Sequence, residues 1–177
     1  MGSRYFVGYR VGGEAADYYA KTAEDLAARF GVRDLSKYIP PHFTLKAPFE
    51  TDNVALFKEE LAALAAKERA TPFTLQGFDA HSGGSVYLAV ARNSAFQRQA
   101  EKLVHALFPF GERERTLRLP FMPHVSVARH LSDEEKAKVL SYLGSFPGPR
   151  LDLSFDGMTL FAHDGARWNA EETFTFQ

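Results

Sequence analysis

The 177-residue sequence contains no cysteine, which excludes disulfides and thiolate metal sites. No apolar run approaches the length needed to span a bilayer, and the first residues lack a signal-peptide pattern. A cytoplasmic protein with no membrane partner is therefore expected. The net charge is −1, without the basic excess of a large nucleic-acid footprint. If RNA is a partner, we expect only a short end of it to be gripped.

The sequence also lacks linkers, low-complexity tracts and any HExxH or comparable metal-ligand spacing, so we predict no zinc site and no cofactor. Hydrophobic residues make up 45% of the chain, and its 16 phenylalanines can supply a substantial core. This length and composition predict a single domain, of two small lobes, over residues 1–177. Nothing in the sequence demands more than a monomer.

Hydrophobic periodicity predicts four helices among several strands. The first helix runs from about residue 16 to 30 and stops at Gly31, and the second, over 54–65, is capped near Thr51 or Asp52. Capping-box patterns precede the other two helices, Ser94 with Gln97 and Ser132 with Glu135, the latter helix ending near Gly144. Strands are predicted at about 4–11, 42–47, 73–75, 86–90, 123–128, 151–155, 158–161 and 173–176.

Several of these strand pairs are joined by connections too short for a parallel crossover. The expected fold is therefore α+β in two similar lobes, with antiparallel sheets and helices packed outside them. The order of elements hints at a duplicated plan, in which each lobe gives one strand to a shared cleft.

Two segments carry the chemistry. Pro41-His42-Phe43-Thr44-Leu45 and Pro123-His124-Val125-Ser126-Val127 have the same pattern of residue types, with their histidines 82 residues apart. Side chains alternate faces along a strand, so each segment offers an imidazole and a hydroxyl on one face and buries two apolar side chains on the other. Bringing the two strands together gives two proton carriers and two hydrogen-bond donors, a set suited to chemistry on a phosphate.

This doubled pattern resembles the signature of the 2H phosphoesterases, the superfamily of 2′–5′ RNA ligase-like proteins and cyclic nucleotide phosphodiesterases. The resemblance covers nearly the whole chain. It implies a bilobal α+β fold with internal pseudo-twofold symmetry and metal-independent opening or closing of ribose 2′,3′-cyclic phosphates. Carried over by residue, it implies that His42 and His124 are catalytic and that Thr44 and Ser126 bind phosphate. The Ser126 position more commonly holds threonine, a change that keeps the hydroxyl.

The chemistry explains these residue types. Opening a cyclic phosphodiester requires a base to take a proton from water and an acid to protonate the departing ribose oxygen. An ordinary histidine pKa of about 6.5 allows one imidazole to be neutral and the other charged near neutral pH. Hydroxyl donors can stabilise charge on the non-bridging oxygens. Which histidine is acid and which is base stays open at this point.

Accessory residues are less strongly indicated. Lys46 continues the face of His42 at period two and can approach the phosphate or stand at a solvated rim. Arg129 resembles the arginine of a His-x-Thr/Ser-x-x-Arg arrangement in many relatives, but strict alternation turns it away unless the chain bends. Tyr38 and Phe121, and less so Tyr87, are candidates for stacking on a base. The basic stretch at 113–118 could guide RNA or be an ordinary exposed loop.

The four remaining histidines do not share the motif pattern, and we expect structural or solvent-facing roles for them: His81, His105, His130 and His163. The favoured hypothesis is a phosphoesterase that opens a 2′,3′-cyclic phosphate on a nucleotide or RNA end. Three alternatives remain open: the same chemistry on a non-nucleotide cyclic sugar phosphate, as in phosphonate breakdown; reversible 2′–5′ ligation; and a module that binds phosphate or RNA ends without turnover.

Overall fold

The computed structural model describes residues 3–110 and 121–177, which form two four-stranded antiparallel sheets. In sheet A the strand order is β2 (His42–Thr51), β1 (Ser3–Arg10), β7 (Gly157–His163) and β8 (Trp168–Thr175). In sheet B the order is β5 (His124–Ala128), β4 (Ser85–Val90), β3 (Thr71–His81) and β6 (Arg150–Phe155). The predicted α+β class with antiparallel sheets is confirmed.

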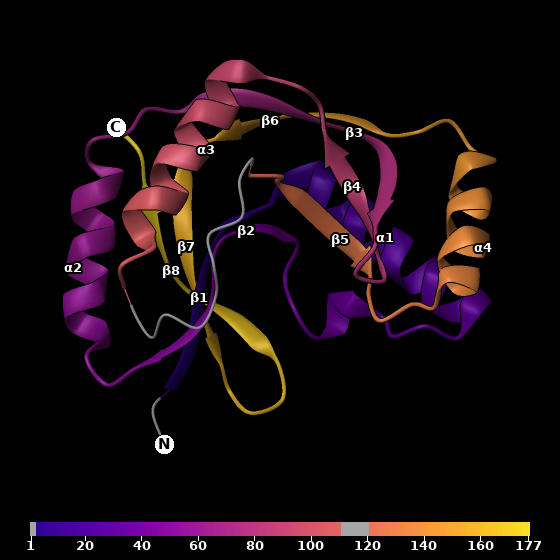
Figure 1. Cartoon of the computed structure of the whole chain (residues 1–177), viewed down its shortest axis with the longest axis horizontal. Helices are drawn as coiled ribbons and strands as arrows, with labels where there is room; N and C mark the ends of the chain where they lie inside the picture. The colour runs from indigo at the N-terminus through magenta and orange to yellow at the C-terminus, as the bar shows by residue number, and fades with distance from the viewer. Residues whose placement is uncertain (1–2, 111–120) are drawn as a thin grey trace.

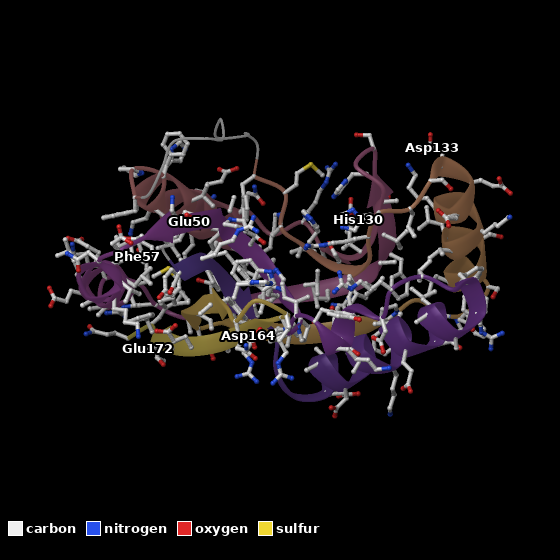
Figure 2. All side chains as sticks on the ribbon, turned by 90° about the horizontal axis from the view of Figure 1, so that it is seen from below. Glu50, Phe57, His130, Asp133, Asp164 and Glu172 are labelled. Carbon is white, nitrogen blue, oxygen red and sulfur yellow. The ribbon has the colours of Figure 1, made fainter. Side chains whose placement is uncertain are left out.

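Four α-helices pack on these sheets: α1 (Gly13–Phe30), α2 (Val54–Ala65), α3 (Ser94–Leu107) and α4 (Asp133–Gly144). Figure 1 shows α2 and α3 on the side of sheet A, and α1 and α4 on the side of sheet B. In Figure 2, Phe57 on α2 and Glu172 on β8 lie at one end of the molecule, and Asp133 at the start of α4 lies at the other. The helices therefore cover two lobes from outside, as expected.

Each lobe follows one plan. The unit β1–α1–β2 builds one side of sheet A, and the unit β4–α3–β5 builds one side of sheet B. Helix α1 leaves its own sheet to contact β5 and α4, while α3 contacts β2. This reciprocal exchange ties the lobes together. It also brings the two edge strands that begin with the motif histidines, β2 and β5, next to each other.

The core lies on the face of these strands opposite the histidines. The apolar side chains of both motifs are buried: Phe43, Leu45, Val125 and Val127. Phe43 packs against the rings of Tyr9, Phe73, Phe96 and Phe155, which come from both sheets and α3. The alternation predicted from the sequence therefore holds where the core requires it. In the described part of the chain, no helix has the length and apolar character needed to cross a membrane.

Two predicted helix caps were wrong. The N-cap of α2 is Asn53, whose Oδ1 accepts from the Leu56 amide, in place of Thr51 or Asp52. The N-cap of α3 is Asn93, because its side-chain oxygen accepts from two amides, those of Ala95 and Phe96. A side-chain carbonyl one residue earlier thus takes the place predicted for the Ser94 hydroxyl.

The capping box of Ser132 and Glu135 at α4 is confirmed. Four strands extend clearly beyond their predicted ranges: β2 (His42–Thr51), β3 (Thr71–His81), β7 (Gly157–His163) and β8 (Trp168–Thr175). The added residues pair with a neighbouring strand, so ladder hydrogen bonds stabilise segments whose side chains show no clear alternation.

Candidate active site

His42 begins β2 at the edge of sheet A and is held by its own backbone. Its Nδ1 lies 2.8 Å from the carbonyl oxygen of Pro40. Because a carbonyl oxygen can only accept, Nδ1 carries the proton and donates it, which leaves the Nε2 lone pair free in the neutral ring. The ring rests on two phenylalanines, with centroids 4.8 Å from Phe6 and 5.5 Å from Phe161. The orientation and the tautomer of His42 are thus both fixed.

Gly8 on β1 makes room for this arrangement. It pairs with Thr44, and a Cβ at this position would lie 2.6 Å from the Phe43 carbonyl oxygen and 3.5 Å from Cδ2 of His42. A strand glycine often marks such a close approach. The missing side chain lets the backbone of β2 lie close against β1 next to the His42 ring.

His124 begins β5 and repeats the geometry of His42. Its Nδ1 lies 2.8 Å from the carbonyl oxygen of Met122, again two residues earlier. The same argument assigns the proton to Nδ1 and leaves Nε2 free. The surroundings differ, however, because His124 packs against Tyr87 and His81, each with its ring centroid 5.0 Å away. The backbone anchor is therefore shared by the two lobes, and the ring environment is not.

Burial and neighbouring cations lower the pKa of both histidines. The pKa of His42 falls to about 4, chiefly through burial, with smaller contributions from Arg129 and His124. Burial also lowers the pKa of His124, with contributions from His81 and Arg129. Arg129 therefore lies within electrostatic range of both imidazoles. Without a ligand, both imidazoles favour the neutral form.

The two motif hydroxyls differ in exposure. Ser126 is 5% exposed, and among the described residues its Oγ has no hydrogen-bond partner. A buried hydroxyl without a partner is costly to the fold. Thr44 is half-buried and lies opposite Gly8 on the histidine face of sheet A. Its hydroxyl can donate to a phosphate oxygen from the second strand.

Arg129 follows the last residue of β5, and the chain turns directly after it. His130 has φ +61°, the single positive φ of a non-glycine residue in the described ranges. The strand ends at Ala128, so Arg129 lies just beyond the alternation of β5, and His130 turns the chain after it. Contact between Arg129 and a phosphate stays a prediction. Burial lowers the pKa of Arg129, whose charge acts on both His42 and His124. No carboxylate of the described residues lies within 4.0 Å of its guanidinium.

Lys46 lies at an irregularity in the pairing of β1 and β2. The register between β1 and β2 skips a residue between Thr44 and Lys46, so the period-two argument for Lys46 fails at this bulge. The Lys46 ammonium lies 5.1 Å from the ring of Phe49, and burial lowers its pKa. Contact between Lys46 and a substrate stays a prediction.

The two stacking candidates lie in different places. Phe121 lines a pocket beside His124, and its backbone is held by Glu101 and Gln97 on α3. Tyr38 is 37% exposed and stacks under the guanidinium of Arg33, at 3.4 Å from the ring centroid. Stacking of either ring on a base stays a prediction. The basic stretch at 113–118 lies outside the described residues.

Sequence reasoning missed two neighbours of His124. His81, expected to be structural or solvent-facing, ends β3 with its ring against His124, and the ring of Tyr87 packs against both imidazoles. Asp79 and Tyr87 line the pocket, of about 340 Å³, that adjoins His124. Tyr87 and Ser126 are direct partners in the β4–β5 ladder. The contact between His81 and His124 depends on how the β3–β4 hairpin meets β5, which no local pattern records.

No group of three or more histidine, aspartate or glutamate side chains in the described ranges is arranged to hold a metal ion. The site instead gathers imidazoles, hydroxyls and one guanidinium. These groups can move protons and bind an anion, which is the set required for phosphoryl chemistry by acid–base catalysis.

Comparisons with known proteins show the family to which the chain belongs. The sequence profile described as the 2'-5' RNA ligase superfamily matches residues 17–167. Two relatives, both named "Putative phosphoesterase", come from Geobacillus kaustophilus (32% identical over 87% of this chain and 90% of the relative) and Geobacillus thermodenitrificans (33% identical over 88% and 90%).

Similar solved structures show the same fold at low sequence identity. The protein TT0787 of Thermus thermophilus has a TM-score of 0.65 at 17% identity, covering 98% of this chain and 97% of that one. E. coli LigT complexed with 3'-AMP has a TM-score of 0.57 at 19% identity, covering 100% and 99%. The likeness extends over both lobes.

Proposed function

The chain belongs to the 2′–5′ RNA ligase superfamily of 2H phosphoesterases, and from this premise we propose that it opens 2′,3′-cyclic phosphates on a nucleotide or RNA end. The catalysis we propose is metal-independent and uses His42 and His124. Phosphoesterase activity is what the superfamily and the named relatives support. The cyclic substrate and the two-histidine mechanism are our proposal.

The observation that carries this proposal is the matched pair of imidazoles. Each histidine donates Nδ1–H to the carbonyl two residues earlier and keeps Nε2 free. A structural histidine gains nothing from having its counterpart in the other lobe anchored in the same way. A proton donor and a proton acceptor on opposite sides of one phosphorus do require two histidines anchored in the same way, because in-line displacement places the entering and leaving oxygens on opposite sides.

The proposed step needs only water, the substrate and the two histidines. The Nε2 of one neutral histidine takes a proton from water as the water oxygen forms a bond to phosphorus. The bond from phosphorus to one ribose oxygen breaks, and that oxygen receives a proton from Nε2 of the other, charged histidine. The product is a ribose phosphomonoester. The hydroxyls of Thr44 and Ser126 donate to the non-bridging oxygens, and Arg129 offsets their charge.

Substrate binding provides the charged histidine that the proposed step needs. Burial and neighbouring cations lower the pKa of both histidines, so the empty site holds too few protons for an acid. An anionic phosphate between the rings favours the charged imidazole and raises its pKa. One proton therefore enters together with the substrate. A charged and a neutral histidine are present together only while substrate is bound.

Turnover of 2′,3′-cyclic nucleotides in EDTA tests the proposal. We expect each of His42→Ala and His124→Ala to lower kcat about 10²–10⁴-fold, the usual contribution of a positioned proton carrier. His105→Ala provides a matched control, because His105 is an exposed residue of α3. Loss of wild-type activity in EDTA, or activity retained in both site variants, would refute the mechanism.

The nature of the group attached to the phosphate can be tested in the same assay. E. coli LigT, with the same fold, has been solved with 3'-AMP, and the pocket beside His124 can accept a base next to Phe121. We therefore expect 2′,3′-cyclic nucleotides to be turned over faster than a cyclic sugar phosphate without a base. Equal rates would favour the non-nucleotide substrate, and tight binding without product would favour a binding module.

A further inference from the structure

A second group of aromatic and cationic side chains lies beside His42, on the side that the proposed mechanism does not use. Trp168 begins β8 and packs edge-to-face on Phe6 with a centroid distance of 4.8 Å. Phe6 is in turn 4.8 Å from the ring of His42. The buried ring of Phe6 therefore separates the indole from the imidazole.

The segment before β2 joins this group. The Trp168 amide donates to the Tyr38 carbonyl oxygen at 2.8 Å, and the Tyr38 ring carries the Arg33 guanidinium 3.4 Å above it. On the other side, the Arg4 guanidinium lies 5.9 Å over the Trp168 ring, and His163 packs edge-on at 4.9 Å. We call Arg4, Arg33, Tyr38, His163 and Trp168 the Trp168 platform. Figure 1 shows the β7–β8 hairpin in yellow and the purple segment that follows α1, which together supply four of its residues.

The turn that presents Trp168 is fixed by one carboxylate. Asp164, labelled in Figure 2, accepts from the amides of Ala166 and Arg167 and from Nδ2 of Asn169, at 2.8–2.9 Å. These donors lower the pKa of Asp164 to about 2. The hairpin is thus pre-ordered, and the Asp164 carboxylate is already engaged by its own turn.

The platform's cations, in contrast, are not engaged by carboxylates. Within the described ranges, neither Arg4 nor Arg33 has a carboxylate oxygen within 4.0 Å, and both side chains are exposed. Two exposed guanidiniums over two aromatic rings can bind an anion and a flat ring at the same time. Single-stranded RNA presents this combination in each nucleotide, a phosphate and a base face.

We propose that the Trp168 platform binds the nucleotide adjoining the cyclic phosphate end, so that the preferred substrate is a short RNA strand and not a mononucleotide. This inference rests on the proposed function of the His42–His124 site. It is consistent with the overall charge of −1, because only two arginines and two rings are needed to hold one additional nucleotide.

Trp168 is the chain's single tryptophan, so it reports directly on binding. The ligands are a ribotetranucleotide with a 3′-phosphate and the corresponding 3′-mononucleotide, neither of which can be turned over. We expect the tetranucleotide to quench Trp168 fluorescence and to bind about tenfold more tightly than the mononucleotide, as one stacked base predicts. Its log Kd should rise with log salt concentration with a slope of about 0.7 for each arginine that contacts a phosphate.

Variants separate the platform from general electrostatics. Arg33→Ala should weaken tetranucleotide binding about tenfold and reduce the salt slope, with no change for the mononucleotide. Arg33→Lys should keep the salt slope but lose affinity, because lysine does not stack on Tyr38 as a planar fork does. Arg150→Ala provides the control, since Arg150 lies on β6, at the edge of sheet B opposite β5, and should change neither value.

The cyclic-phosphate forms of both ligands distinguish this inference from the proposed function. Faster turnover of the tetranucleotide, lost in Arg33→Ala, supports the platform. Quenching with no turnover of either ligand would leave the platform supported and refute the proposed function. Equal kcat/KM for both ligands with a silent Trp168, or an unaltered tetranucleotide affinity in Arg33→Ala, would overturn the platform while the proposed function stands.

Discussion

Removing the hydroxyl of Ser126 should make the protein more stable and less active. In the described structure the Ser126 Oγ is buried and has no hydrogen-bond partner. An unsatisfied buried hydroxyl costs about 1–3 kcal/mol relative to its hydration in the unfolded chain. Ser126→Ala removes this cost and leaves only a small void behind it.

We expect the free energy of unfolding to rise by about 1 kcal/mol once the void is considered, which corresponds to about 2–4 °C in Tm for a chain of this size. Activity should change in the opposite direction. A hydroxyl that donates to a charged phosphate oxygen contributes about 1.5–3 kcal/mol, so kcat/KM for a 2′,3′-cyclic nucleotide should fall about 10–10²-fold.

The two quantities are measured by urea denaturation and by steady-state turnover of the same preparation. Thr44→Val is the informative companion, because Thr44 is half-buried and its hydroxyl can be hydrated in the free protein. It should lose a similar amount of activity without gaining stability. A Ser126→Ala variant that is destabilised by about 1 kcal/mol or more and retains full activity would mean that the hydroxyl serves the fold and not a ligand.

Three further predictions concern the histidines and Gly8. The pKa of His42 falls from 6.5 to about 4 on folding, so below pH 6.5 the unfolded chain binds a proton that the folded chain does not. The free energy of unfolding should therefore decline by about 3 kcal/mol as the pH falls from 6.5 toward 4. Urea denaturation of His42→Gln should show a flatter pH dependence. Gly8→Ala should cost about 1–3 kcal/mol in stability and lower kcat, because its Cβ meets a backbone oxygen, whereas Gly144→Ala, with open space around it, should be neutral or stabilising; equal midpoints would contradict this. His81→Ala should raise the pKa of His124 in an NMR titration, since a neighbouring positive charge is lost; an unchanged value would show that the ring contact has no electrostatic consequence.

Much of the fold followed from local patterns, because the two motif strands must bury Phe43, Leu45, Val125 and Val127 in one core. A chain that alternates in this way can place its histidines only on the opposite face. A bend that returns Arg129 to the face of His124 was expected; β5 ends at Ala128, just before Arg129, and the left-handed backbone of His130 follows it. The strand alternation was thus encoded locally, whereas its interruption was only inferred from the resemblance.

The neighbours of the histidines could not be predicted in this way. His81 meets His124 because the β3–β4 hairpin turns over β5, and this is a tertiary relation between residues far apart in the sequence. The period-two argument fails for Lys46 because β2 has a bulge that the hydrophobic pattern does not predict. Gly8 is an exception, because a glycine in a strand of otherwise large residues indicates a close approach of another group.

The duplicated plan also explains why the two histidines share a backbone anchor but not their surroundings. Backbone anchors are set by the strand geometry, so both lobes give the same Nδ1 contact and the same free Nε2. Ring environments are set by side chains, and these differ: His42 lies on Phe6 and Phe161, whereas His124 lies against His81 and Tyr87. In the proposed mechanism this common scaffold supplies one proton carrier from each lobe. The unequal packing then gives the proton donor and the proton acceptor different surroundings.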